Sequence, residues 1–231
     1  MTQSAWTRKF YPREGDGVGF DRVVFFSDAV FAIALTLAAV EIGLPEVEGD
    51  PNLPSNLLNA VLDKGGIFAG FVVAFVWVAI YWRANQRFTM TLRGMSGTYV
   101  NAVLVYLVLI AFLPIPAATL GEYWSNPAAI ALFAIYGSLV STMEVVLLVV
   151  ADRGDLFTVP LTSEFRRTSV LGSLTPVVGF LTSIPLAFVS PWLALLWWVV
   201  ASVGLGAAIN RFLPSQPPVD PQVTSADRRA T

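Results

Sequence analysis

Polar side chains at the start of the first apolar segment are the residues best suited to chemistry in this chain. Arg22, Ser27 and Asp28 lead into an apolar run that continues through Leu37. An ionised side chain close to hydrocarbon costs about 2.5 to 3.5 kcal/mol, so Asp28 is expected to face protein or water and to pair with a neighbouring group. Arg22 and Asp28 are six residues apart, nearly two helical turns, which favours partners on other helices or other subunits. The cluster therefore predicts either a functional site or an interhelical tie without a transport role.

Glu144 is the second carboxyl group that lies within an apolar segment. It is about 10 Å from the end of that segment at the rise of an α-helix. We expect it to pair with an arginine such as Arg22 or Arg83, or to be protonated. Asp28 and Glu144 would together suit a proton-coupled secondary transporter, in which carboxyl groups inside the membrane carry the proton.

The composition excludes several other kinds of chemistry. The chain has no cysteine and no histidine, which removes disulfides, thiol and imidazole catalysis and the usual ligands of transition metals. Neither a pairing of nucleophile and base nor a phosphate-binding loop stands out, so we expect no enzyme activity, no cofactor and no bound metal. The sequence also lacks a basic patch for nucleic acid.

The elements that position these carboxyl groups are predicted to be membrane-spanning helices. Hydrophobic residues make up 55% of the 231 residues, and the mean hydropathy is +0.67, which is typical of an all-α polytopic membrane protein. A helix needs about 20 residues to cross the bilayer. Six segments of that size are predicted, over residues 21–43, 65–88, 97–119, 128–150, 168–189 and 192–212.

The last two predicted spans share an uncharged stretch from Thr168 to Asn210, which Ser190-Pro191 interrupts. This stretch is too long for one span and suits two spans in a tight hairpin. The alternative is one helix that lies half-buried in the membrane interface.

The loop charges predict the orientation of the chain. Lys and Arg occur at positions 8, 9, 13 and 22, at 83, 87 and 93, at 153, 166 and 167, and at 211, 228 and 229. The opposite loops carry acidic residues instead, with Lys64 as the exception. The positive-inside rule then places both termini in the cytoplasm.

This orientation divides the chain into a cytoplasmic N-terminal segment (1–20), a transmembrane domain (21–212) and a polar tail (213–231) that we expect to be disordered. No cleavable signal peptide is visible, so the first span is expected to direct insertion into the cell membrane.

One face of the first predicted helix carries Ile33, Leu37 and Val40, because residues three and four apart lie on the same side. Such a stripe commonly packs against a neighbouring helix, and lining a pore is the alternative. Thr36 has an ordinary role available as well, since its hydroxyl can bond to the preceding turn.

The ordered motif from Arg22 to Ala34 permits a more specific interpretation. Arg-x-x-x-Phe-Ser-Asp followed by Ala-Val-Phe-Ala-Ile-Ala resembles the signature of the transmembrane protein 175 family of potassium channels, in its bacterial single-repeat form. The resemblance implies a homotetramer of six-helix subunits around a central pore that the first helix lines. It also implies that Ile33 is the constriction, that Leu37 and Val40 form further apolar layers, and that Thr36 contributes to selectivity.

The same resemblance implies a network that stabilises the cytoplasmic end of the pore helix. Its members would be Arg22, Phe26, Ser27, Asp28, Trp82 and Asn85. Members of the family often carry histidines three to four residues after this tryptophan, where this chain has Asn85 and Gln86. Amides form hydrogen bonds without titrating, so the network is expected to persist and pH sensing through it to be lost.

The predicted function is passive conduction of potassium ions through this tetrameric pore, with the chain itself, the lipid bilayer and monovalent cations as its partners. Narrow rings of Ile and Leu can exclude water and close a pore by dewetting. No Thr-Val-Gly-Tyr-Gly-like filter loop is present. The alternatives are the proton-coupled transporter that uses Asp28 and Glu144, and a noncatalytic membrane scaffold.

Overall fold

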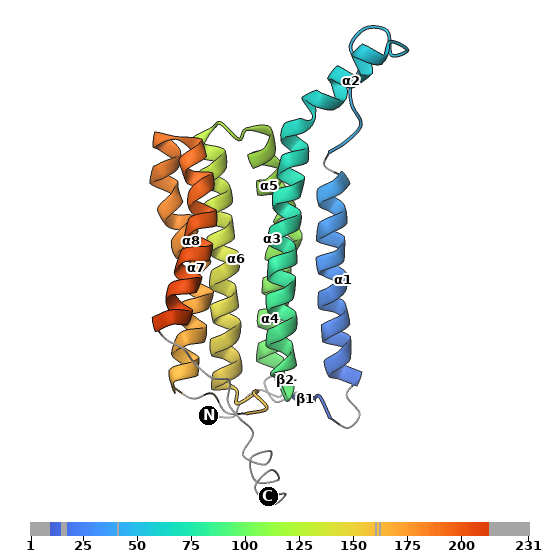
Figure 1. Ribbon diagram of the computed structural model, residues 1–231. Coiled ribbons are helices and arrows are strands. Elements are labelled where there is room, and N and C mark those ends of the chain that lie inside the picture. Colours follow the sequence, from blue (N-terminus) through green and yellow to red (C-terminus); the bar gives the residue numbers. More distant parts are fainter. Residues whose placement is uncertain (1–9, 15–17, 41, 160, 162, 213–231) are drawn as a thin grey trace, which may run out of the picture.

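The chain folds as an antiparallel helical bundle (Figure 1). The structure is a computed structural model that describes residues 10–14, 18–40, 42–159, 161 and 163–212. Its helices are α1 (Val18–Val40), α2 (Pro54–Asp63), α3 (Gly65–Met90), α4 (Gly97–Phe112), α5 (Pro114–Glu122), α6 (Pro127–Arg153), α7 (Ser163–Val189) and α8 (Pro191–Phe212). Two short strands, β1 (Phe10–Pro12) and β2 (Gly94–Ser96), form a ribbon at one end. The prediction of an all-helical membrane fold is confirmed.

Five segments in the described part of the chain are long and apolar enough to cross a membrane. They are Val18–Val40, Gly65–Met90, Gly97–Glu122, Pro127–Arg153 and Arg166–Val189. They correspond to the first five predicted spans, and α8 occupies the position of the sixth. The predicted tail 213–231 lies outside the described residues.

The first span lies three residues nearer the N-terminus than the predicted 21–43. Its last turn closes with hydrogen bonds from the Ile42 amide to the Ala39 carbonyl (3.3 Å) and from the Gly43 amide to the Val40 carbonyl (3.1 Å). Gly43 then adopts a φ of 62°, which glycine reaches without steric cost and which commonly ends a helix. The helix therefore stops before this glycine.

The third predicted span, 97–119, is divided into α4 and α5 at Leu113. Pro114 and Pro116 follow this residue, and a proline can neither donate the next backbone hydrogen bond nor fit against the carbonyl four residues earlier. The Leu113 amide instead bonds to the Ile110 carbonyl three residues back, at 3.2 Å. The two helices still continue one another as a single apolar segment, Gly97–Glu122.

The hydropathy pattern did not predict α2 or the β-ribbon. In the ribbon, β1 pairs antiparallel with β2, so that Phe10 lies opposite Ser96 and Pro12 opposite Gly94. Part of the predicted N-terminal segment 1–20 is thus hydrogen-bonded to the connection between α3 and α4. At the other end of the bundle, α2 extends beyond the remaining helices (Figure 1).

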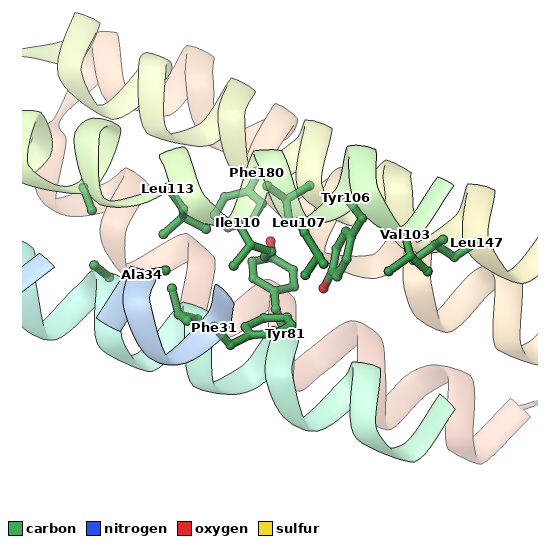
Figure 2. Close-up of a cluster of buried hydrophobic side chains, with 14 of the residues drawn as sticks. Phe31, Ala34, Tyr81, Val103, Tyr106, Leu107, Ile110, Leu113, Leu147 and Phe180 are labelled. Atoms are coloured by element: carbon green, nitrogen blue, oxygen red, sulfur yellow. The ribbon is translucent and has the colours of Figure 1, made fainter. Parts of the chain in front are cut away.

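Two groups of helices meet in the core. Helix α1 packs on α3 and α4, whereas α7 packs on α6 and α8. Between them lie aromatic side chains, among them Phe31 of α1 against Tyr106 of α4, with ring centroids 6.1 Å apart, and Phe180 of α7 (Figure 2). The indole of Trp77 contacts the ring of Phe180 at 4.7 Å between centroids, which joins α3 to α7.

Helices α3 and α5 approach most closely at glycines. A Cβ atom added at Gly70 would lie 2.6 Å from the Ala117 carbonyl oxygen, and one at Gly121 would lie 2.5 Å from the Gly66 carbonyl oxygen. Real Cβ atoms do not come this close to backbone, so only glycine fits at this crossing. The close packing fixes α3 and α5, against which α1 lies.

Candidate functional site

The face of α1 that carries Ile33, Leu37 and Val40 is uncovered in the protomer. These side chains are 54%, 46% and 72% exposed. Successive residues of a helix are about 100° apart, so Leu37 and Val40 lie within about 40° of Ile33 around the axis. The opposite face is buried against α3 and α4, through Phe31, Ala34 and Ala38. The three apolar residues therefore share a surface that the fold of one subunit leaves open.

Arg22 and Phe26 project from this same open face, each within about 20° of Ile33 around the helix axis. Arg22 is exposed, and Phe26 is 53% exposed. Arg22 makes no hydrogen bond or ion pair with any other described residue. The structure of one subunit thus does not bring these two side chains to Asp28, although all three belong to the predicted network.

Thr36 lies on the open face beside Ile33. Its hydroxyl donates a hydrogen bond to the carbonyl of Ile33 at 2.9 Å. Because the hydroxyl proton is used within the helix, the oxygen presents its lone pairs outward. Such an oxygen can accept a hydrogen bond from water or contact a cation.

Asp28 ties α1 to α3. Its Oδ1 atom accepts a hydrogen bond from Nε1 of Trp82 at 2.9 Å and one from Nε2 of Gln86 at 2.5 Å. Trp82 and Gln86 are four residues apart and share one face of α3. The carboxylate is therefore satisfied by neutral donors from a single neighbouring helix.

Asn85 does not take part in this contact within one subunit, where Gln86 supplies the amide. Asn85 precedes Gln86 by one residue and so points about 100° away around α3, where it lines a cavity. Asn85 and Gln86 follow Trp82 by three and four residues, so both can share a face of α3 with it, and the spacing alone does not choose between the two amides.

Ser27 is buried, and its hydroxyl donates to the Val23 carbonyl of its own helix at 2.9 Å. It adds no hydrogen bond between helices, because its proton goes to the preceding turn of α1. The tie between α1 and α3 therefore depends on Asp28.

Glu144 has a tyrosine as its partner, and the predicted ion pair with Arg22 or Arg83 is not formed among the described residues. The Tyr106 hydroxyl of α4 donates to Glu144 Oε1 at 3.3 Å. Arg22 projects from the uncovered face of α1, and Arg83 is exposed on α3, so neither guanidinium reaches the carboxyl group. The signal for this contact in the sequence was Tyr106, a residue with a hydroxyl group in the middle of the apolar helix α4.

A second polar contact lies nearby in the core. The Tyr81 hydroxyl of α3 meets the Ser141 hydroxyl at 2.9 Å and donates to the Gly137 carbonyl at 3.2 Å, both on α6. Figure 2 shows Tyr81 and Tyr106 among the buried apolar side chains. These bonds hold α3 to α6 in a region where few other polar groups are available. Within the described residues, no group of three or more acidic side chains is arranged to hold a metal ion.

Comparison with known proteins identifies the family. Residues 22–114 match the family described as the endosomal/lysosomal potassium channel TMEM175. A potassium channel of Streptomyces collinus is 30% identical over 183 residues, which cover 75% of this chain and 85% of the relative. This chain belongs to the TMEM175 family.

Further comparisons agree with this TMEM175 assignment. A potassium channel of Chamaesiphon minutus is 30% identical over 127 residues, covering 54% of this chain and 61% of the relative. The fold is similar to the crystal structure of a lysosomal potassium-selective channel TMEM175 homolog from Chamaesiphon minutus, with a TM-score of 0.67 and 21% identity over 83% of this chain and 98% of that chain. The TMEM175 family consists of ion channels and not of enzymes, and its member described here is a multi-pass membrane protein.

Proposed function

We propose that this TMEM175 family member is a potassium-permeable cation channel in which four copies surround a central pore lined by α1. The observation that carries this proposal is the uncovered face of α1, where Ile33, Leu37 and Val40 lie on one line. A single subunit supplies one such helix, so a pore needs several copies, and closed cyclic symmetry is the usual arrangement. Relatives named as potassium channels support potassium as the permeant ion.

The apolar layers would act as the gate. Narrow rings of Ile33, Leu37 and Val40 would exclude water, because their side chains form no hydrogen bonds with it, and they would offer no oxygen to replace the hydration shell of an ion. A tilt or rotation of α1 would widen the rings and let a partly hydrated cation pass. Thr36 would place a ring of hydroxyl oxygens beside the constriction, where they can contact the ion as it loses water.

The contact of Asp28 with Trp82 and Gln86 would set the rotation of α1 and hence which side chains meet at the axis. A rotation of one residue, about 100°, would replace Ile33 in the ring with a neighbour. In this proposal Arg22 and Phe26 lie on the pore side below the constriction, since they share its face of the helix.

The charge distribution supports an orientation with the β-ribbon end in the cytoplasm. Arg13, Arg87 and Arg93 line the region beside the ribbon, whereas Glu46, Glu48 and Asp63 surround α2 at the opposite end. Basic residues favour the cytoplasmic side, and the acidic end would concentrate cations at the outer mouth.

Ion flux with a substitution at the constriction tests activity and site together. The purified protein in liposomes should carry passive potassium flux, and both Ile33→Ala and Ile33→Asn should raise it several-fold by widening or wetting the ring. Ile135→Ala is a matched control, because Ile135 is an isoleucine of α6 that is 56% exposed, close to the 54% of Ile33. Equal flux in the two alanine variants would rule out Ile33 as the constriction.

The assembly requires a separate measurement. Native mass spectrometry from mild detergent should give four chains per particle. A monomer or a dimer would exclude a central pore built from four α1 helices, whatever the result of the flux assay.

The competing proton-coupled transporter has weaker support in the geometry. Such a mechanism would link Asp28 to Glu144, yet Asp28 is not among the residues that line the cavity beside Glu144. Asp28 is instead held by neutral donors of α3. Saturable, proton-coupled flux that is abolished by Glu144→Gln would favour the transporter, and passive flux that persists in Glu144→Gln would favour the channel.

A further inference from the structure

A large cavity opens within each subunit at the end of the bundle where the β-ribbon lies. Its volume is about 1510 Å³, and α3, α4, α6 and α7 contribute to its walls together with β1. No residue of α1 lines it, so it is distinct from the face proposed to form the pore. It is larger than the roughly 300 to 1,000 Å³ typical of small-molecule sites.

The inner end of the cavity is acidic. Glu144 lines it, and the only described partner of its carboxyl group is the Tyr106 hydroxyl at 3.3 Å. Hydrogen bonds from a hydroxyl to a carboxylate are normally about 2.5 to 2.7 Å long, so this contact is a weak one. No Lys or Arg among the described residues lies within ion-pair distance of Glu144. The carboxyl group of Glu144 therefore has no cationic partner among the described residues.

The walls of the cavity are mixed in character. Phe88 and Phe157 meet edge to face, with ring centroids 5.7 Å apart, and both line the cavity with Leu147 and Leu148. On α7, a Cβ atom added at Gly172 would have no atom within 4 Å, which marks open space along this wall. The cavity thus offers apolar and aromatic walls next to the carboxyl group of Glu144.

Two of the arginines at the mouth are already bonded within the protein. Arg13 donates from Nη1 to the Met90 carbonyl at 2.6 Å, and Arg93 forms an ion pair with Asp155 at 2.6 Å. Glu14 adds a negative charge beside them, and Arg87 a positive one. Asp155 and Glu14 thus offset two of the three arginine charges at the mouth, whereas the bond to the Met90 carbonyl occupies a donor of Arg13 without neutralising its charge.

We propose that this cavity binds an organic cation with a protonated amine and an aromatic or alkyl body, with the amine against Glu144 and Tyr106. The amine would donate to the carboxylate, and the body would lie among Phe88, Phe157 and Leu147, where aromatic faces also attract positive charge. This site does not depend on the proposed pore, because it lies inside one subunit.

Benzylammonium is a suitable probe, because benzyl alcohol is its neutral counterpart of similar size and benzoate its anionic one. Isothermal titration calorimetry on the full chain in lipid nanodiscs should show benzylammonium binding to one site per subunit, at least about tenfold more tightly than benzyl alcohol, as expected for one charge-assisted hydrogen bond. Glu144→Gln should reduce the affinity for benzylammonium to that for benzyl alcohol. Glu122→Gln, which removes an exposed carboxylate at the end of α5, should leave it unchanged.

A second variant separates the cavity from the carboxyl group. Gly172→Leu places a side chain in the open space along α7 and should weaken both benzylammonium and benzyl alcohol by a similar factor, while Glu144 is retained. Equal affinity of the wild type for benzylammonium and benzyl alcohol, or tighter binding of benzoate, would overturn the proposal. So would unchanged benzylammonium binding in both Glu144→Gln and Gly172→Leu. The readout is binding, so these results stand whether or not the pore proposal survives its flux test.

Discussion

Replacing Asp28 by alanine would remove the hydrogen bonds between side chains of α1 and α3. The carboxylate accepts from Trp82 at 2.9 Å and from Gln86 at 2.5 Å. A hydrogen bond to a charged group contributes about 1.5 to 3 kcal/mol when it is shielded from water. The Trp82 side chain is 40% exposed, so water competes for the donors, and we take about half of the lower value for each bond. Asp28→Ala should therefore reduce the free energy of unfolding by about 1 to 2 kcal/mol.

Asp28→Asn is the matched variant, because it keeps the size and one carbonyl oxygen and loses the charge. It should lose about half as much stability as Asp28→Ala, since neutral hydrogen bonds are roughly half as strong as charge-assisted ones. Both variants can be compared with the wild type by titration with sodium dodecyl sulfate in mixed micelles, followed by circular dichroism.

A double-mutant cycle isolates the bond to the indole. Combining Asp28→Ala with Trp82→Phe should give a coupling energy of about 0.5 to 1 kcal/mol, because each substitution alone removes the bond between the two side chains. A coupling energy of zero, together with wild-type unfolding of Asp28→Ala, would show that the contact adds nothing to the position of α1. In liposomes, Asp28→Ala should also change potassium flux, since the rotation of α1 is then less strongly set.

Two further predictions address packing and pH. Gly121→Ala should destabilise the protein by about 1 to 3 kcal/mol in the same titration, because the added methyl group meets the Gly66 carbonyl and the backbone of Gly70. Gly65→Ala is the control, since nothing lies within 4 Å of the new carbon. It should be neutral or stabilising by up to about 1 kcal/mol. Potassium conductance in planar bilayers should change less than about twofold between about pH 6 and 8, because the chain has no histidine. A steep change of conductance in that interval would contradict this prediction and would mean that a carboxyl group titrates there.

The long helices could be predicted because the mean hydropathy of some twenty residues depends on their composition. It does not depend on which neighbour each side chain contacts in the fold. The end of α1 needed a local feature, the positive φ of Gly43, which the apolar run alone does not reveal. The division at Leu113 follows from Pro114, a residue that spans also tolerate without a break, as Pro176 and Pro185 inside α7 show. Short elements such as β1 have too few residues for any periodicity to be visible.

Contacts between helices were harder to predict than the helices themselves. The cost of a buried charge indicated that Asp28 needs a partner, and the family resemblance implied that Trp82 lies near. The choice between Asn85 and Gln86 depends on how α3 is rotated. Glu144 was expected either to pair with an arginine or to be protonated, because charge was the only criterion available from the sequence. The fold instead brings Tyr106 to it, since α4 packs on α6 and both arginines point elsewhere.

The β-ribbon constrains how the protein can be inserted into the membrane. Phe10 and Ser96 pair across the ribbon although they are 86 positions apart, with α1 and α3 between them. At a synthesis rate of about 5 to 20 residues per second, the first strand waits roughly 4 to 17 s for its partner. The pairing then requires both strands on one side of the bilayer, so a chain in which only one of α1 and α3 crossed could not form it. Pairing of β1 with β2 is therefore compatible with α1 and α3 both crossing the bilayer and incompatible with only one of them doing so.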